Sequence, residues 1–163
     1  MNSLVLKPLS ETDEAAVIRM LTDDIVKKTY MVPDFTSQDQ AQKLFLRLKE
    51  FSRSQERFVQ GIYIDEHLVG MINDVGIDGR RIELGYVIHP DHHNRGYCTE
   101  ALKKAIEELF YKGFEEILAG AFAENAASIR VMEKAGMQRS DRSEEIKYRG
   151  VKHRCIYYEI KRQ

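Results

Sequence analysis

Apolar and polar residues follow two patterns along the chain, one typical of strands and one typical of helices. Short apolar stretches bounded by turn residues predict strands at residues 4–6, 58–64, 68–75, 82–88 and 117–122. Asp65-Glu66 and Asp78-Gly79 are tight turns that make the middle three strands an antiparallel meander. Residues 144–148 and 152–160 form a closing hairpin around Arg149-Gly150.

Helical spacing of apolar residues marks four further segments. Helices are predicted to begin at residues 10–13, at residues 37–40, near Thr99, and at Asn125 or Ala126. The first two starts carry the serine of a helix cap, and the second helix has Ala41, Leu44, Leu48 and Phe51 on one face. Gly113 and Gly136 end the last two helices. Residues 27–36 lack periodicity. They could form a loop over a binding cleft, but we favour a packed connection.

The order of these elements indicates the fold class. A strand at 82–88, a helix and a strand at 117–122 make a crossover whose strands are parallel. We therefore expect an α/β (α+β) fold in one domain over residues 1–163. Its single twisted sheet is mixed and mostly antiparallel, with six to seven strands and about four flanking helices. The closing hairpin leaves an exposed sheet edge, so a homodimer is a candidate assembly.

Composition excludes several classes of protein. Hydrophobic residues make up 43% of the 163 residues and charged residues 31%, with a net charge of -1. This balance predicts a globular protein that does not bind nucleic acid. No apolar run approaches the roughly 20 residues that span a bilayer, so we expect no membrane partner and a cytoplasmic location. Cys98 and Cys155 lie far apart in sequence, which favours two reduced thiols.

The segment between the strand at 82–88 and the following helix has the chemistry of an anion site. Unpaired amides and the positive end of the helix dipole meet there, where a pyrophosphate would fit. Gly96 allows close backbone approach and Arg95 adds a cation. Amides of the first helical turn come from Tyr97, Cys98 and Thr99. A plain strand-to-helix turn is the alternative.

Two other chemistries are disfavoured in this segment. His89, His92 and His93 with Asp91 suggest zinc, but adjacent histidines do not easily converge on one ion, so we predict no metal. A helix start would lower the pKa of the Cys98 thiol, but we disfavour a role for this thiol as a nucleophile.

Residues 83–90 followed by 93–102 resemble the strand, phosphate loop and helix of GNAT acetyltransferases, closest to the RimJ/RimL-type protein N-terminal acetyltransferases. Residues 123–137 resemble the family's later helix, and residues 4–9 its first strand, so the resemblance covers nearly the whole chain. The family signature Gln/Arg-x-x-Gly-x-Gly/Ala corresponds to residues 93–98, where Gly96 is retained. Asn94 stands where many relatives have glycine.

The resemblance implies acetyl-CoA as co-substrate, a GNAT fold and no metal. It implies coenzyme contacts at Val87, Ile88, Asn94, Arg95, Gly96, Tyr97, Cys98, Thr99, Asn125 and Ser128. Main-chain amides of Val87 and Ile88 would face the acetyl carbonyl and the pantetheine arm, whereas their side chains pack in the core. Asn125 either contacts pantetheine or caps a helix. The hydroxyl of Ser128 is expected near the sulfur, where it would stabilise the departing thiolate.

Glu83 lies on the strand that leads to the acetyl site and is the candidate base for the acceptor amine; a strand carboxylate without a catalytic role is the alternative. A peptide α-amine is the favoured acceptor. A small amine such as a polyamine, aminoglycoside or amino acid is the second possibility, for which Asp23, Asp24 and Asp34 are candidate contacts. A non-catalytic acyl-CoA binding module is the third.

Overall fold

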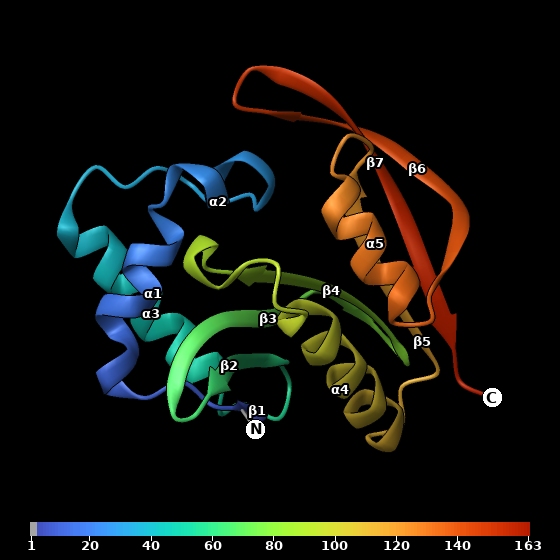
Figure 1. The fold of residues 1–163 in the computed structure, drawn as a ribbon, viewed down its shortest axis with the longest axis horizontal. Coiled ribbons are helices and arrows are strands. Elements are labelled where there is room, and N and C mark those ends of the chain that lie inside the picture. The colour runs from blue at the N-terminus through green and yellow to red at the C-terminus, as the bar shows by residue number, and fades with distance from the viewer. Residues whose placement is uncertain (1–2) are drawn as a thin grey trace. The chain divides into compact units, whose positions relative to one another are not determined.

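The computed structural model describes residues 3–163, which divide into two compact units. The N-terminal unit runs to Asn73 and includes Tyr86–Tyr97, whereas the C-terminal unit comprises Asp74–Gly85 and Cys98–Gln163. Figure 1 follows the chain from one end to the other. The assignment of one domain to residues 1–163 stays a prediction.

The described residues contain seven strands: β1 (Leu4–Lys7), β2 (Val59–Ile64), β3 (His67–Asp78), β4 (Arg81–Ile88), β5 (Glu116–Phe122), β6 (Gln138–Tyr148) and β7 (Val151–Lys161). Their order in the sheet is β1-β2-β3-β4-β5-β7-β6. Neighbours pair antiparallel at β1–β2, β2–β3, β5–β7 and β6–β7, but β4 and β5 are parallel. This confirms the mixed, mostly antiparallel sheet, including the parallel crossover.

The helices are α1 (Glu14–Leu21), α2 (Asp24–Thr29), α3 (Gln38–Phe51), α4 (Tyr97–Tyr111) and α5 (Ala126–Lys134), with single 3-10 turns at Glu11–Asp13 and Pro90–His92. The predicted cap of α3 is present, because Ser37 Oγ accepts a hydrogen bond from the Gln40 amide at 3.3 Å. Among the α-helices of the described residues, α2 alone was not predicted. Asp23 caps it by accepting from the amides of Ile25 and Val26. No described helix is long and apolar enough to cross a membrane.

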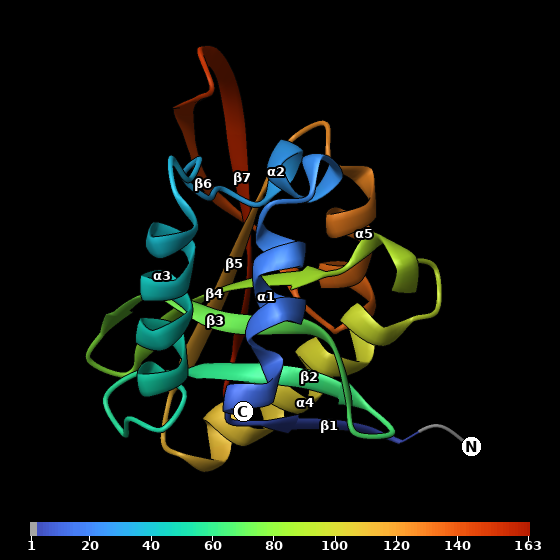
Figure 2. The same ribbon diagram turned by 90° about the vertical axis from the view of Figure 1, so that its left-hand side faces the viewer.

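The N-terminal unit has a core between helices α1 to α3 and the first strands. Figure 2 shows α1 and α3 side by side in this unit. Phe45, which is 2% exposed, is the largest side chain of α3 in the core. The core residues are Leu9, Val17, Met20, Leu21, Val26, Val32, Phe45, Val59, Met71 and Val87. Val32 and Phe35 contact this core, which supports a packed connection over residues 27–36.

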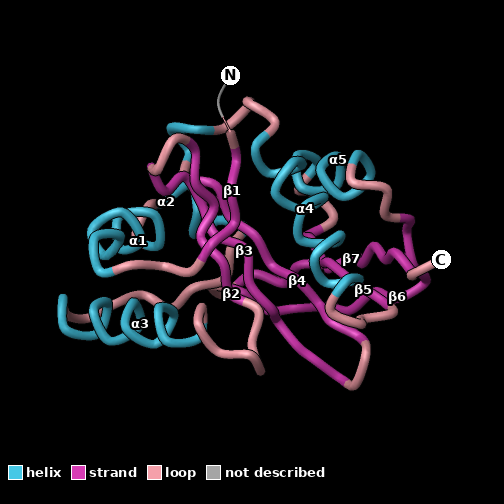
Figure 3. The backbone as a smooth tube through the Cα atoms, turned by 90° about the horizontal axis from the view of Figure 1, so that it is seen from below, coloured by secondary structure: helices cyan, strands magenta, loops and turns pink. Residues whose placement is uncertain are grey.

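The C-terminal unit is built on the strands β5, β7 and β6. Arg149 and Gly150 both have positive φ angles, 52° and 78°, as a two-residue hairpin turn requires. The pairing of β6 with β7 therefore runs from Tyr148↔Val151 back toward Gln138↔Glu159. Figure 3 shows α5 on one side of this group of strands, and α5 contacts β5. The strand order leaves β6 at one edge of the sheet.

Two glycines end α4 and α5 as predicted. Gly113 has φ of 105°, and the next amide, that of Phe114, donates to the carbonyl of Leu109 at 3.1 Å. Gly136 has φ of 93°, and the amide of Met137 donates to the carbonyl of Met132 at 3.1 Å. Both are Schellman ends, which need a left-handed residue and so favour glycine.

Candidate active site

The loop before α4 has an unusual backbone conformation. Asn94 and Gly96 both have left-handed φ angles, of 63° and 76°. Asparagine is one of the few residues besides glycine that tolerates this region, which explains how Asn94 replaces the glycine of many relatives. A turn of this kind, leading into the first amides of a helix, presents N–H groups to an anion.

Hydrogen bonds made by three histidines hold the loop against β3 and β4 in the N-terminal unit. His93 Nε2 lies 2.8 Å from the carbonyl oxygen of Ile88, and the His92 amide donates to the carbonyl of His89 at 2.9 Å. The His89 amide in turn donates to Val69 of β3 at 2.9 Å. These histidines thus have a structural role in shaping the loop.

Gly96 faces open space. A Cβ atom built on this residue would meet no atom within 4 Å, so only the φ angle, and not a neighbour, favours glycine for folding. Arg95 beside it is exposed. A phosphate group can therefore approach the backbone here, and this chemistry fits the pyrophosphate of a coenzyme.

Cys98 lies in the first turn of α4. Burial raises the pKa of its thiol to about 12, so the thiol stays protonated at neutral pH. The predicted lowering of this pKa is wrong, because burial of the thiol raises it. This result agrees with a direct transfer that uses no cysteine nucleophile. Tyr97 and Thr99 are half-buried in the same turn.

Val87 and Ile88 have buried side chains, exposed by 7% and 6%. Gly70 on β3 lies so close that a Cβ there would collide with the Val87 carbonyl oxygen. The side chains therefore serve packing, as expected, and any contact with a ligand would use their main chain.

Asn125 and Ser128 lie at the start of α5 in the C-terminal unit. Asn125 Oδ1 accepts a hydrogen bond from the Ser128 amide at 3.2 Å, so the capping role of Asn125 is present. Ser128 is half-buried one turn into the helix. The coenzyme contacts of both residues stay predictions.

Glu83 is a partly buried carboxylate on β4, with 21% of its side chain exposed. Its Oε1 lies 3.8 Å from Arg142 Nη1 of β6. Burial raises the pKa of Glu83, Glu144 adds to the rise, and the Arg142 guanidinium opposes it. A carboxyl group with a raised pKa is suited to accept a proton near neutral pH.

The sequence pattern did not reveal the side chains around Glu83. Tyr157 on β7 donates a hydrogen bond to Glu144 Oε1 at 2.7 Å, and the Arg142 guanidinium lies 4.1 Å from the centre of the Tyr157 ring. Counting residues from the Arg149-Gly150 turn pairs Glu144 with Cys155, so part of this group was predictable. The contact of Arg142 with Glu83 was not, because it joins β6 to β4, two strands far apart in sequence.

A second polar pair lies beside Asn125 in the C-terminal unit. His153 Nδ1 is 2.6 Å from Glu124 Oε1, and the His153 ring stacks on Phe122 at 4.1 Å. The hydrogen bond of Glu124 with its own backbone, followed by its bond with His153, lowers the pKa of Glu124. This contact joins β7 to the turn before α5, and sequence reasoning had not singled out either residue.

The histidines of the loop bear on the zinc alternative. Within residues 3–163, no group of three or more histidines, cysteines or acids is placed to hold a metal ion. His89 accepts a hydrogen bond from the Asp91 amide at 3.1 Å, and burial lowers the pKa of His92.

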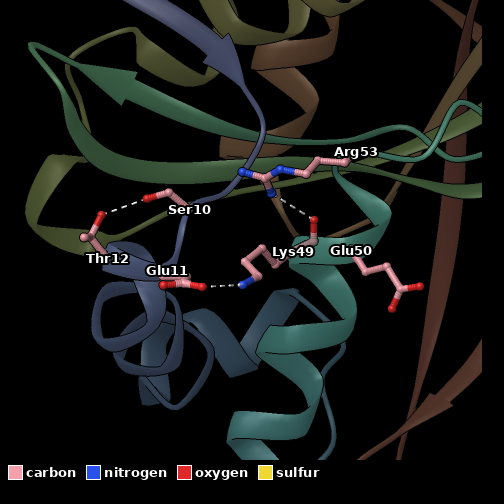
Figure 4. Close-up of a pocket in the computed structure, with 6 residues that line it drawn as sticks. All are labelled: Ser10, Glu11, Thr12, Lys49, Glu50 and Arg53. Carbon is pink, nitrogen blue, oxygen red and sulfur yellow. Dashed lines mark hydrogen bonds and ion pairs between the residues drawn. The ribbon is translucent and has the colours of Figure 1, made fainter.

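One pocket of about 670 Å³ lies in the N-terminal unit, away from the predicted residues in sequence. Figure 4 shows its charged lining, in which Lys49 pairs with Glu11 at 3.6 Å and Arg53 bonds the Lys49 carbonyl oxygen at 3.3 Å. It is lined by Ser10, Glu11, Thr12, Lys49, Glu50 and Arg53. Its lining contains none of the predicted site residues.

Comparison with known proteins identifies the class to which this fold and loop belong. Residues 3–138 match the family model described as an acetyltransferase (GNAT) domain. The chain therefore belongs to the GNAT acetyltransferase family. The uncharacterized N-acetyltransferase YoaA of Bacillus subtilis is 27% identical over 83% of this chain and 80% of its own length. The uncharacterized N-acetyltransferase YnaD of the same organism is 30% identical, over 83% of this chain and 79% of its own length. The expected enzyme class, an N-acetyltransferase, is confirmed.

Solved structures confirm the fold. A GNAT acetyltransferase from Bacillus anthracis has a TM-score of 0.83 at 24% identity, over 99% of this chain and 98% of that one. RimL, a ribosomal L7/L12 α-N-protein acetyltransferase solved with coenzyme A, has a TM-score of 0.80 at 15% identity, over 98% and 94%. Spermidine N-acetyltransferase from Vibrio cholerae, solved with CoA and spermine, has a TM-score of 0.80 at 16% identity. The match covers 97% of this chain and 95% of that one. These two neighbours act on different amines, so the fold alone does not specify an acceptor.

Proposed function

We propose that this protein transfers the acetyl group of acetyl-CoA directly to a primary amine, and that a peptide or protein N-terminal α-amine is the favoured acceptor. The observation that carries the proposal is the left-handed Asn94 and Gly96 loop before α4, with open space beside Gly96. In a GNAT family member this loop is suited to bind the coenzyme's pyrophosphate.

Each candidate residue has a role in this proposal. Backbone amides from Asn94 to Thr99, including those of Tyr97 and Cys98, and the Arg95 side chain bind the pyrophosphate. The main chain of Val87 and Ile88 binds the pantetheine arm, while Asn125 and Ser128 contact the pantetheine and sulfur from the start of α5. When bound, acetyl-CoA supplies the activated acetyl group.

The pKa of the acceptor amine determines how much its nitrogen depends on a general base. An α-amine with a pKa of about 7.8 is neutral in roughly one molecule in seven at pH 7, compared with about one in two thousand for a lysine-like amine of pKa about 10.4. Glu83 is partly buried, and burial raises the pKa of its carboxyl group. We assign it the role of accepting the proton from the acceptor nitrogen, directly or through water.

The acids that would favour a dicationic acceptor are already engaged within the N-terminal unit. Asp34 pairs with Lys27 at 3.1 Å, and Asp23 caps α2 through the amides of Ile25 and Val26. Asp24 lies in the first turn of α2, where an acid stabilises the helix. These local roles support a peptide α-amine ahead of a polyamine.

Mass spectrometry of acetyl transfer across a panel of amines tests the proposal. The panel contains short peptides with free α-amines, matched α-blocked and ε-blocked peptides, spermidine, an aminoglycoside and free amino acids. We expect transfer to the free α-amines and none to the α-blocked peptides. Transfer to spermidine or the aminoglycoside alone would replace the favoured acceptor with a small amine. Binding of acetyl-CoA without transfer to any amine would contradict an enzymatic role.

A further inference from the structure

Three side chains of the closing hairpin form a contact network that reaches Glu83 within the C-terminal unit. Arg142 and Glu144 come from β6, and Tyr157 comes from β7. Arg142 contacts Glu83 and the Tyr157 ring, and Tyr157 donates a hydrogen bond to Glu144. The candidate base thus contacts a cation that lies over a tyrosine ring, and the same tyrosine holds a second carboxylate in position.

Arg142 lies in an irregular segment of β6. The register changes between Arg139, which pairs with Tyr158, and Ser143, which pairs with Ile156. Regular antiparallel pairing would keep the sum of paired residue numbers constant, but this sum rises from 297 to 299 across the segment. β6 thus advances four residues while β7 advances two, an insertion of two that keeps the alternation of side chains between the faces while it bends the strand locally. The Arg142 amide, bonded to Ser140 Oγ at 3.1 Å, helps to hold this segment.

Glu144 reaches the same group by regular pairing. It lies opposite Cys155, and Tyr157 follows two residues later on the same face of β7. Beside Tyr157, on β5, lies Gly120, where a Cβ would come within 2.7 Å of the tyrosine ring. The absence of a side chain at Gly120 therefore leaves room for the ring that supports Arg142 and Glu144.

We propose that Arg142 and Glu144 are positioning residues that act on Glu83 with opposite sign, so that the β6–β7 hairpin sets the pH at which Glu83 accepts the proton of the acceptor amine. This inference rests on the proposed function. In the step concerned, the N–H bond of the acceptor ammonium breaks and an O–H bond forms on Glu83. No other bond changes.

The charges that face Glu83 determine the direction of each effect. Arg142 and Arg81 favour the carboxylate, whereas burial and Glu144 favour the protonated acid. Tyr157 and Cys155 are the other titratable groups near it, and the pKa of each is raised, so both are neutral. Replacing Arg142 by a neutral residue must then raise the pKa of Glu83. Replacing Glu144 by a neutral residue must lower it.

The tests are Arg142→Gln and Glu144→Gln, each with a matched control. The control for Arg142→Gln is Arg142→Lys, which keeps the positive charge on β6. The control for Glu144→Gln is Glu145→Gln, which removes the carboxylate of the neighbouring exposed residue, paired in the sheet with Arg154. Carboxyl carbon NMR follows the titration of Glu83 in the whole protein, with its signal assigned by Glu83→Gln. We expect Arg142→Gln to move the midpoint up by about half to one pH unit, given screening by water.

Glu144→Gln is expected to move the midpoint down by a smaller amount, while both controls leave it in place. The acidic limb of kcat/KM, measured with an amine that the panel shows to be acetylated, should move in the same directions. The titration of the amine itself is common to all variants. If Arg142→Gln fails to fold, the downward shift in Glu144→Gln still tests the inference.

Shifts in the same direction, or no shift in either variant, would overturn the inference even if the wild-type enzyme acetylates amines. Opposite NMR shifts in a wild-type protein that acetylates no amine would leave the electrostatic coupling in place and overturn the proposed function. The two failures are therefore distinguishable.

Discussion

Gly96 offers the sharpest test of the phosphate loop, because its surroundings separate charge from shape. A Cβ at this position would meet no atom within 4 Å, and the φ angle of 76° lies in the left-handed region. Gly96→Asp and Gly96→Asn have nearly equal volume and both tolerate this region, as Asn94 does at 63°. The two variants therefore differ in one negative charge beside the expected pyrophosphate.

The size of the effect follows from Coulomb's law. Two unit charges about 6 Å apart repel by about 0.7 kcal/mol at the dielectric constant of water and about 1.4 kcal/mol at half that value. A pyrophosphate with two charges doubles this to about 1.4–2.8 kcal/mol. The affinity of Gly96→Asp for acetyl-CoA should thus be about tenfold to a hundredfold below that of Gly96→Asn.

Isothermal titration calorimetry with acetyl-CoA measures this difference, and thermal unfolding checks that both variants are folded. The cost of the left-handed conformation, roughly 1 kcal/mol, should lower the stability of both variants equally. Because the repulsion is electrostatic, the difference should shrink as salt is added. Equal affinities of two folded variants at low salt would refute the assignment of this loop to the pyrophosphate.

Three further predictions follow from other parts of the chain. Ser128→Ala should lower kcat by about tenfold with little change in acetyl-CoA affinity, if its hydroxyl stabilises the thiolate, whereas unchanged constants would make Ser128 only a helix residue. Cys98 in the native protein should react with iodoacetamide at pH 8 at least about a hundredfold more slowly than a free cysteine peptide, because burial raises its pKa to about 12; rapid labelling, followed by peptide mapping, would contradict this. Phe45→Ala should lower the free energy of unfolding in urea by about 3–5 kcal/mol, and Leu46→Ala, at a position 48% exposed, by well under half as much.

Local chemistry allowed much of the fold to be predicted from the sequence. The turn at Asp65-Glu66 and the caps at Ser37, Gly113 and Gly136 lie where their residue types predicted them, since each depends on backbone angles of a few neighbouring residues. The loop with Asn94 and Gly96 was located for the same reason. Helix α2, of six residues, was missed because it is too short to show a periodic pattern.

The surroundings of Glu83 depended on tertiary structure. Sequence placed Glu83 on a strand and Glu144 in a hairpin, but whether a strand carboxylate is hydrated or buried depends on what packs against it. The contact of Arg142 with Glu83 joins β6 to β4, which are far apart in sequence, and the change in the register of β6 beside Arg142 leaves no mark in the alternation of polar positions. Likewise, the dipole argument gave the wrong sign for the pKa of Cys98, because burial is a property of the folded chain. Sequence thus determined the elements and the loop, through local backbone chemistry, whereas the charge state of the candidate base depends on long-range contacts that only the folded structure makes.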